Sequence, residues 1–240
     1  MRKSLFMVMA AMVATAILSG CEKEDKDAID MSVVQKGIDT IDGQLVVDLG
    51  FANHLLWATC NLGADSPEKT GNFYAWAETE KKDSYALDNY KWMKDGVSFT
   101  KYTFSKDQKD VEMEVIDNKT VMDASDDPAK AALGSRWSTP SDGDFTELVS
   151  RCDWRCCKLN GEWGYLFTSK VNGNSIFMPL AGFMDETDNF HIQSLGYYWT
   201  TKMSNDTREA KMFVLNRPEN NPVAKSEERY LGFPIRPVYK

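Results

Sequence analysis

One stretch in the middle of the chain has the spacing of an amphipathic helix. Its apolar side chains recur at positions i, i+3, i+4 and i+7: Phe145, Leu148, Val149 and Cys152. This spacing places them on a single helical face, which can pack against a core. Ser141, followed three residues later by Asp144, is typical of a capped N-terminus. We therefore expect a helix over about residues 141–152.

A second, shorter helix is expected over about residues 128–133. Asp127 can accept hydrogen bonds from the first turn, and Pro128 suits the first helical position. Gly134 can end the helix, because glycine is common just past a helical C-terminus. The short length and the two flanking signals together predict about one and a half turns.

Period-two alternation and short apolar runs predict strands on both sides of these helices. The candidates are separated by turn-forming residues and cover residues 44–49, 55–59, 164–169, 174–182, 197–201, 210–216 and 230–238. Residues 81–116 are instead polar and irregular with scattered aromatic side chains, which is typical of a long surface loop. Because helices are confined to the middle and strands lie near both ends, the pattern predicts an α+β fold with paired terminal strands.

The first residues have the pattern of a secretory signal peptide. Arg2 and Lys3 precede an apolar run over residues 5–18, which is too short and wrongly flanked to span a membrane. The sequence Leu-Ser-Gly-Cys that follows resembles the lipobox of bacterial lipoproteins. That resemblance implies removal of residues 1–20 and a lipid anchor on the Cys21 thiol, which holds a protein at a membrane without crossing it. The alternative is an ordinary signal peptide with a cysteine here by chance.

Residues 21–43 are expected to form a flexible tether ahead of a single domain over residues 44–240. Residues 22–30 are highly charged and have no bulky side chain before Ile29, so they can bury little apolar surface. This run resembles the acidic export signal of Bacteroidota lipoproteins, which implies display at the outer face of the outer membrane; a plain spacer is the alternative. Thr40 lies in an Asp-Thr-Ile setting that resembles the O-glycosylation sequon of these bacteria, and it is a glycosylation candidate.

Composition and charge argue against several classes of function. The chain of 240 residues has a formal net charge of −8. This balance argues against nucleic acid as a partner, because phosphate binding depends on clustered lysine and arginine. Only two histidines occur, so a histidine-rich zinc site or a histidine-based hydrolase is poorly supplied. A body of about 200 residues is large enough to bury one full core.

Six segments match the pattern of one known family in both order and content. They are VDLGFANHLLWATCNLGADSPEKTGNFYAWAETE, DNKTVMDASDDPA, LGSRWSTPSDGDFTEL, NGNSIFMPLAGF, GYYWTT and GFPIRPV, and they cover about residues 44–239. The chain thereby resembles the Fibrobacter succinogenes major paralogous domain family, which is common in Bacteroidota lipoproteins. The resemblance implies a C-type-lectin-like fold, distantly similar to formylglycine-generating enzymes, more firmly than it implies a function. The chain departs from the family at Ala77, where relatives have glycine, and at Ser138, where they have arginine.

Four cysteines follow Cys21: Cys60, Cys152, Cys156 and Cys157. An exported chain meets an oxidising compartment, where disulfides are the default, and four cysteines allow three pairings. The family resemblance places Cys60 and Cys152 at its two usual cysteine positions and so implies a bridge between them; two separate buried thiols are the alternative. Cys156 and Cys157 are left free or exchange with Cys152. No cysteine follows Cys157, which argues against a second zinc-ligand pair and against a formylglycine-generating activity.

Acidic side chains gather in one irregular stretch: Asp117, Asp123, Asp126 and Asp127. Calcium takes about six to eight oxygen ligands, so the first three are candidate calcium ligands, although no cofactor is required. Asp127 already has an explanation as a helix cap, and a solvated acidic face is the alternative for the others. Glu78 and Glu80 have the residue type of a glycosidase pair, but no second feature of the sequence supports hydrolysis.

Aromatic side chains of the irregular segment are candidates for sugar recognition, in which flat rings stack on the C–H face of a pyranose. The candidates are Tyr85, Tyr90, Trp92 and Tyr102. Loops on a rigid scaffold are where binding residues concentrate. Trp57 and Trp199 lie in strand-like segments and are expected in the core instead. Arg236, between Pro234 and Pro237, is expected to be a structural hydrogen-bond or ion partner.

These features predict a non-catalytic, lipid-anchored binding or adhesion protein at the outer membrane. Its expected partners are the membrane, through the anchor, and a glycan or a surface protein. A structural or assembly subunit of a surface fibre or outer-membrane complex is the alternative. An enzyme is not expected, because the sequence offers no set of convergent titratable groups.

Overall fold

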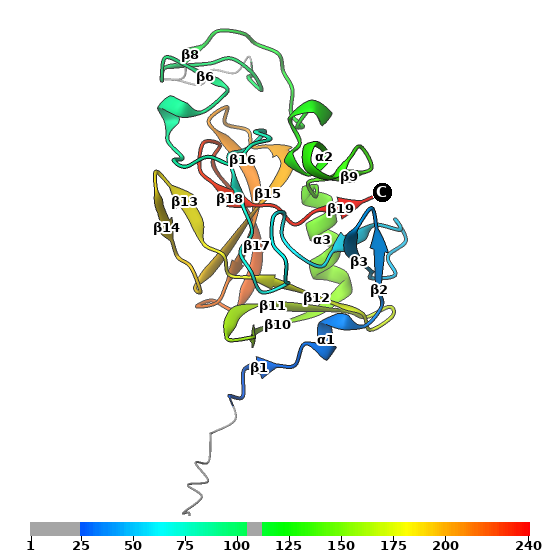
Figure 1. The fold of residues 1–240 in the computed structure, drawn as a ribbon. Coiled ribbons are helices and arrows are strands. Elements are labelled where there is room, and N and C mark those ends of the chain that lie inside the picture. The colour runs from blue at the N-terminus through cyan, green and yellow to red at the C-terminus, as the bar shows by residue number, and fades with distance from the viewer. Residues whose placement is uncertain (1–24, 105–111) are drawn as a thin grey trace, which may run out of the picture.

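The computed structural model describes residues 25–104 and 112–240, so the signal peptide and the predicted lipidation site Cys21 lie outside the described residues. Within these ranges the chain is mainly β-sheet, in six small sheets, with three α-helices (Figure 1). This composition confirms the α+β class. No helix of the described ranges is long and apolar enough to cross a membrane.

Both predicted helices are present with the predicted caps. Helix α3 spans Asp142–Arg151. The Ser141 hydroxyl accepts the N–H of Asp144 at 3.1 Å, and the Asp144 carboxylate accepts the N–H of Ser141 at 2.7 Å. Helix α2 spans Pro128–Leu133 and begins directly after its cap, Asp127. These reciprocal hydrogen bonds satisfy N–H groups that would otherwise lack partners at the helix start.

Helix α3 packs against strands of two sheets, and the main apolar core lies between them (Figure 1). The first sheet has the order β1–β10–β11–β12, with strands Ala28–Ile29, Cys152–Leu159, Glu162–Ser169 and Ser175–Pro179. The second has the order β15–β16–β17, with strands Leu195–Met203, Glu209–Asn216 and Asn221–Glu228. Phe145 of α3 stacks on Phe213 of β16 with ring centroids 4.5 Å apart, so the predicted apolar face of the helix is the buried one.

A five-stranded sheet joins the two ends of the described chain. Its order is β2–β3–β4–β19–β9, with strands Ile38–Ile41, Gln44–Asp48, Leu56–Ala58, Val238–Tyr239 and Trp137–Ser138. Val238 pairs with Trp57 on one side and with Ser138 on the other. A second short pair joins β5 (Phe73–Tyr74) to β18 (Phe233–Pro234). The prediction that strands near the two ends pair is therefore confirmed.

The remaining elements are short. Strands β6 (Met93–Lys94), β7 (Ser98–Phe99) and β8 (Glu112–Met113) form a small sheet within the segment predicted as a loop. Two 3-10 turns span Leu87–Asn89 and Ala124–Asp126. A two-stranded hairpin is formed by β13 (Phe183–Asp185) and β14 (Asp188–Phe190). Over residues 81–104 and 112–116, the described part of the predicted loop, the chain is thus mostly irregular apart from this small sheet and one 3-10 turn.

The packed domain begins well before residue 44, which corrects the predicted tether for residues 25–43. Strand β1 lies parallel to β10, and the backbone N–H of Lys158 donates to the Asp27 carbonyl at 2.7 Å. The single-turn helix α1 (Ser32–Gln35) follows, and β2 pairs with β3. Three apolar side chains at the end of the charged run and just after it belong to one buried cluster or pack against it: Ile29, Met31 and Val34. Their burial offsets the cost of ordering this segment.

Candidate functional site

The four aromatic residues predicted to form an exposed binding surface instead attach their segment to the interior. Tyr85, Tyr90 and Tyr102 are 2%, 1% and 0% exposed, and Trp92 is half-buried. Three of these side chains donate to backbone carbonyls, at 2.5, 2.9 and 2.9 Å: Tyr85 to Phe73, Tyr90 to Trp76, and Trp92 to Ala77. Amphipathic rings can bury their faces while the polar atom finds a carbonyl. The prediction of an exposed aromatic platform here is wrong.

The three candidate calcium ligands have protein partners in the structure. Asp117 accepts backbone N–H groups of residues 102 and 103 at 2.9 and 3.0 Å. Asp123 and Asp126 both lie close to the Lys101 ammonium, at 2.7 and 2.6 Å. In the part of the chain that the structure describes, no group of three or more His, Cys, Asp or Glu side chains is placed to hold a metal. A lysine thus occupies the position between carboxylates that a cation was expected to take.

The predicted Cys60–Cys152 disulfide is not formed, and all four cysteines of the described ranges are free thiols. Cys152 is 1% exposed in the apolar core beneath α3, whereas Cys60 is half-exposed in the wall of a surface cavity. Burial raises the pKa of the Cys152 thiol to about 12 and that of Cys156 to about 11. Cys152 therefore has the inert, small-apolar character expected of both residues as the alternative to a bridge, whereas Cys60 is not buried and does not fit that alternative.

Thr40, the glycosylation candidate, is exposed on β2, which is the edge strand of the five-stranded sheet. Its side chain is accessible, as modification requires. It belongs to a paired strand of the domain, however, and not to the tether in which it was expected.

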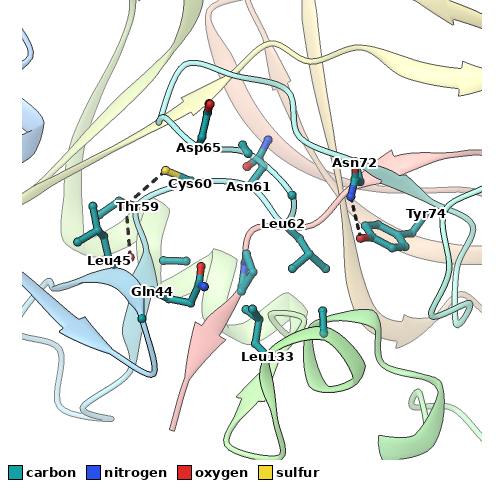
Figure 2. Close-up of a pocket in the computed structure, with 16 residues that line it drawn as sticks. Gln44, Leu45, Thr59, Cys60, Asn61, Leu62, Asp65, Asn72, Tyr74 and Leu133 are labelled. Carbon is teal, nitrogen blue, oxygen red and sulfur yellow. Dashed lines mark hydrogen bonds between the residues drawn. The ribbon is translucent and has the colours of Figure 1, made fainter.

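A cavity of about 610 Å³ opens at the surface between the five-stranded sheet and helix α2 (Figure 2). Its wall is formed by the start of β3, the loop that follows β4 over residues 58–65, the side chains of residues 72 and 74, and the last turn of α2. Cavities of this size are typical of small-molecule sites. We therefore treat it as the candidate functional site.

A buried arginine holds the wall of this cavity in place. Arg236 is 0% exposed, and its guanidinium donates to the Asn61 side-chain oxygen at 2.9 Å and to the Ala58 carbonyl at 3.1 Å. Asn61 in turn donates from its amide to the Thr70 carbonyl at 2.9 Å, which closes the loop. The expected structural role of Arg236 is thus confirmed. A wall fixed by buried hydrogen bonds is pre-organised for a ligand.

The cavity wall alternates apolar and hydrogen-bonding side chains. Figure 2 shows Leu62 and Leu133 pointing toward each other across it, with Gln44 to one side and Asn72 beside Tyr74 on the other. Asn72 donates from its amide to the Tyr74 hydroxyl at 3.4 Å, and its amide oxygen is left to accept from a ligand. Such a wall can contact both the C–H groups and the hydroxyl groups of one ligand.

Gly63 is needed for Asn72 to reach this position. The residue has a φ of 81°, which favours glycine, and an added Cβ would lie only 2.3 Å from the Asn72 side-chain nitrogen. A larger residue here would displace the amide from the cavity. The glycine of the segment CNLGA therefore shapes the site directly.

The side chains of the cavity wall can form hydrogen bonds, and few of them are ionisable. Its ionisable side chains are Cys60, Asp65 and Tyr74, and no histidine lines it. The Cys60 sulfur lies 3.5 Å from the Thr59 hydroxyl, which cannot serve as a general base. Burial raises the pKa of the Tyr74 hydroxyl, so that it stays protonated at neutral pH and can donate a hydrogen bond. The wall can therefore donate hydrogen bonds to a ligand and accept them from it.

None of the cavity-lining side chains was predicted as a ligand-binding residue. The available signal was a pair of amide side chains, Asn61 and Asn72, in the segment that follows a buried strand. Polar side chains at a strand end are often functional, but sequence alone does not show that α2 closes over them. No protein-family model, no curated protein and no solved structure matches the chain.

Proposed function

We propose that the protein is a non-catalytic, lipid-anchored binding protein of the outer-membrane surface, and that it recognises a glycan through the cavity between β4 and α2. The observation that supports this proposal is that the cavity wall contains both apolar and amide side chains. Leu62 and Leu133 line it together with the amides of Gln44 and Asn72. A sugar ring presents both apolar C–H faces and hydroxyl groups, and this wall complements both. A volume of about 610 Å³ is sufficient for one or two sugar units.

Two features of the sequence support the location. The segment that ends at Cys21 resembles a lipobox, and the acidic run that follows resembles an export signal. The resemblance to the major paralogous domain family supports a C-type-lectin-like arrangement, a scaffold type that binds ligands in many proteins without catalysis. The proposal does not place calcium in the cavity; the experiment varies the calcium concentration.

The test is a glycan array probed with the secreted chain, Cys21→Ser to prevent acylation, with and without calcium. Ala132→Trp places a bulky ring in the cavity, because Ala132 lines it from the surface of α2. The matched control is Ala131→Trp, the neighbouring exposed alanine, which does not line the cavity. We expect glycan binding that Ala132→Trp abolishes and Ala131→Trp preserves.

Smaller substitutions test the polar side of the wall. Gln44→Ala and Asn72→Ala each remove an amide from the cavity, and we expect each to weaken binding roughly tenfold, the loss typical of one or two ligand hydrogen bonds. Gln35→Ala removes an exposed amide on α1 and serves as the control. An array without any binder, in calcium and in chelator, would refute the glycan proposal. Binders that Ala132→Trp does not affect would place the site elsewhere.

A further inference from the structure

The β13–β14 hairpin presents an uncommon combination of side chains on one face. In this antiparallel pair Phe183 lies opposite Phe190, and Asp185 lies opposite Asp188. Residues directly opposite in such a pair share a face, and positions two apart along a strand return to that face. Two phenylalanines and two aspartates therefore lie on the same side of the hairpin, in neighbouring rows about 7 Å apart.

The aromatic half of this face is partly open to solvent. The Phe183 and Phe190 rings are stacked with centroids 5.5 Å apart, and Phe190 is 43% exposed. Tyr197 of β15 meets Phe183 edge-on at 5.2 Å, and His191 lies 5.8 Å from the same ring. Tyr197 is half-buried and His191 is exposed. Aromatic carbon surface is thus available beside the carboxylates.

The acidic half is unfavourable as it stands. Like charges placed directly opposite in an antiparallel pair destabilise the sheet. Neither Asp185 nor Asp188 forms an ion pair with any residue that the structure describes. Residues 183–191 contain a third acidic side chain, Glu186, and no lysine or arginine.

The surroundings of the hairpin add further negative charge. The pKa of Tyr197 is raised chiefly by burial and further by the nearby Glu227 carboxylate. Burial is also the largest cause that raises the pKa of Tyr230, and the nearby carboxylates raise it further: Glu228, Asp185 and Glu227. A surface that combines negative charge with open aromatic rings attracts cations with apolar stems.

We propose that this face of the hairpin binds basic side chains of a partner protein. A lysine ammonium or arginine guanidinium lies between Asp185 and Asp188, and its methylene stem crosses the Phe183–Phe190 rings. The spacing of about 7 Å between the two rows matches the length of such a side chain. The bound cation relieves the repulsion between the two carboxylates, and the rings contribute cation–π attraction. The surface shares no residue with the cavity wall, so it is independent of the glycan proposal.

The experiment measures binding of the secreted full chain to a fluorescein-labelled octalysine peptide by fluorescence anisotropy at low salt. Asp185→Asn with Asp188→Asn removes both charges without changing side-chain volume. The matched control is Asp39→Asn with Asp153→Asn, two exposed aspartates on β2 and β10 that change the net charge equally. We expect about tenfold weaker binding for the hairpin pair and less than twofold for the control pair.

Phe190→Ala tests the aromatic half, and we expect it to weaken octalysine binding about threefold. Urea unfolding of every variant shows that the fold is kept, and the hairpin pair is expected to be at least as stable as the natural chain. Equal losses in both aspartate pairs would reduce the effect to non-specific attraction by an acidic protein and overturn the proposal. If the natural chain does not bind octalysine, the proposal is overturned as well. It is also overturned if Phe190→Ala leaves octalysine binding unchanged and instead loses binding on the glycan array.

Discussion

The Lys101 ammonium lies 2.6 Å from an Asp126 carboxylate oxygen, in a pair that is largely withdrawn from solvent. Asp126 is 4% exposed, and the Tyr102 hydroxyl donates to the same oxygen at 2.5 Å. The pair joins the segment predicted as a loop to the turn before α2. The hydrogen bond to Asp126 explains how the Tyr102 hydroxyl is satisfied in the interior.

Replacing Lys101 by methionine is expected to destabilise the fold. The change keeps the side-chain length but leaves a buried carboxylate without its nearest cation, which costs about 2–4 kcal/mol in free energy of unfolding, a little less than for a fully buried pair. Urea unfolding measures the loss. Lys119→Met is the control, because its pair with Asp123 is more exposed and contributes at most about 1 kcal/mol. Equal losses in the two variants would contradict the assigned role of Lys101.

The contribution of Asp123 is expected to depend on pH. Hydrogen bonds from Lys101 and, next, from Lys119 hold the pKa of this carboxyl below its usual range. A carboxyl with a lowered folded-state pKa stabilises the fold fully above the unfolded value of about 3.9, and this contribution is lost as the pH falls through the folded pKa. Asp123→Asn should therefore be less stable than the natural chain at pH 7, and denaturant titrations should show the difference shrinking as the pH falls below about 3.9. A difference that is constant with pH would contradict this account.

Substitution by methionine is expected to destabilise the fold to very different extents at the two fully buried arginines of the described ranges. Arg236 donates to Asn61, Ala58, Thr59 and Phe177. Among the described residues, Arg229 donates only from Nη1, and its Nε and Nη2 atoms find no hydrogen-bond partner. We expect Arg236→Met to cost more than about 3 kcal/mol and Arg229→Met less than about 1 kcal/mol, because removing an unsatisfied buried charge also removes its desolvation penalty. Urea unfolding of both variants compares them; a larger loss for Arg229 would show an unrecognised partner.

The thiols are expected to react very unequally. Cys60 is half-exposed, whereas Cys152 and Cys157 are buried, and burial raises the pKa of Cys152 to about 12. Since the thiolate is the reactive form, Cys60 should be alkylated first and the buried pair only after denaturation. Mass spectrometry of the folded chain after brief iodoacetamide treatment measures this order, and Cys60→Ser should abolish the fast modification. A Cys60–Cys152 bridge in protein purified without reductant would contradict the free-thiol structure.

The helices were predictable because their signals are local. Ser141 and Asp144 cap each other across three residues, and Asp127 with Pro128 marks the start of α2, so no distant contact was needed to place them. The pairing of terminal strands was predictable at the same coarse level. The α+β class follows from these features.

The candidate site and the domain start were not predictable in the same way. Tyr90 and Tyr102 lie in a segment without regular spacing, and only the fold supplies the carbonyl and carboxylate that their hydroxyl groups meet. Ile29 lies within a charged run, and its partner strand is more than a hundred residues away, at Lys158 and Leu159. The cavity likewise depends on α2 lying beside the loop after β4, an arrangement that no local pattern records.

Asp25, four residues after Cys21, forms an ion pair with Lys158 of strand β10 at 2.6 Å. An extended chain covers at most about 3.6 Å per residue, so the four residues from Cys21 to Asp25 can span no more than about 14 Å. With a lipid on Cys21, as proposed, a domain roughly 40 Å across can change its orientation on the bilayer but cannot move away from the bilayer surface. The protein would therefore hold whatever it captures within about one domain width of the headgroups, which favours molecules attached to the same cell's surface over those reached at a distance.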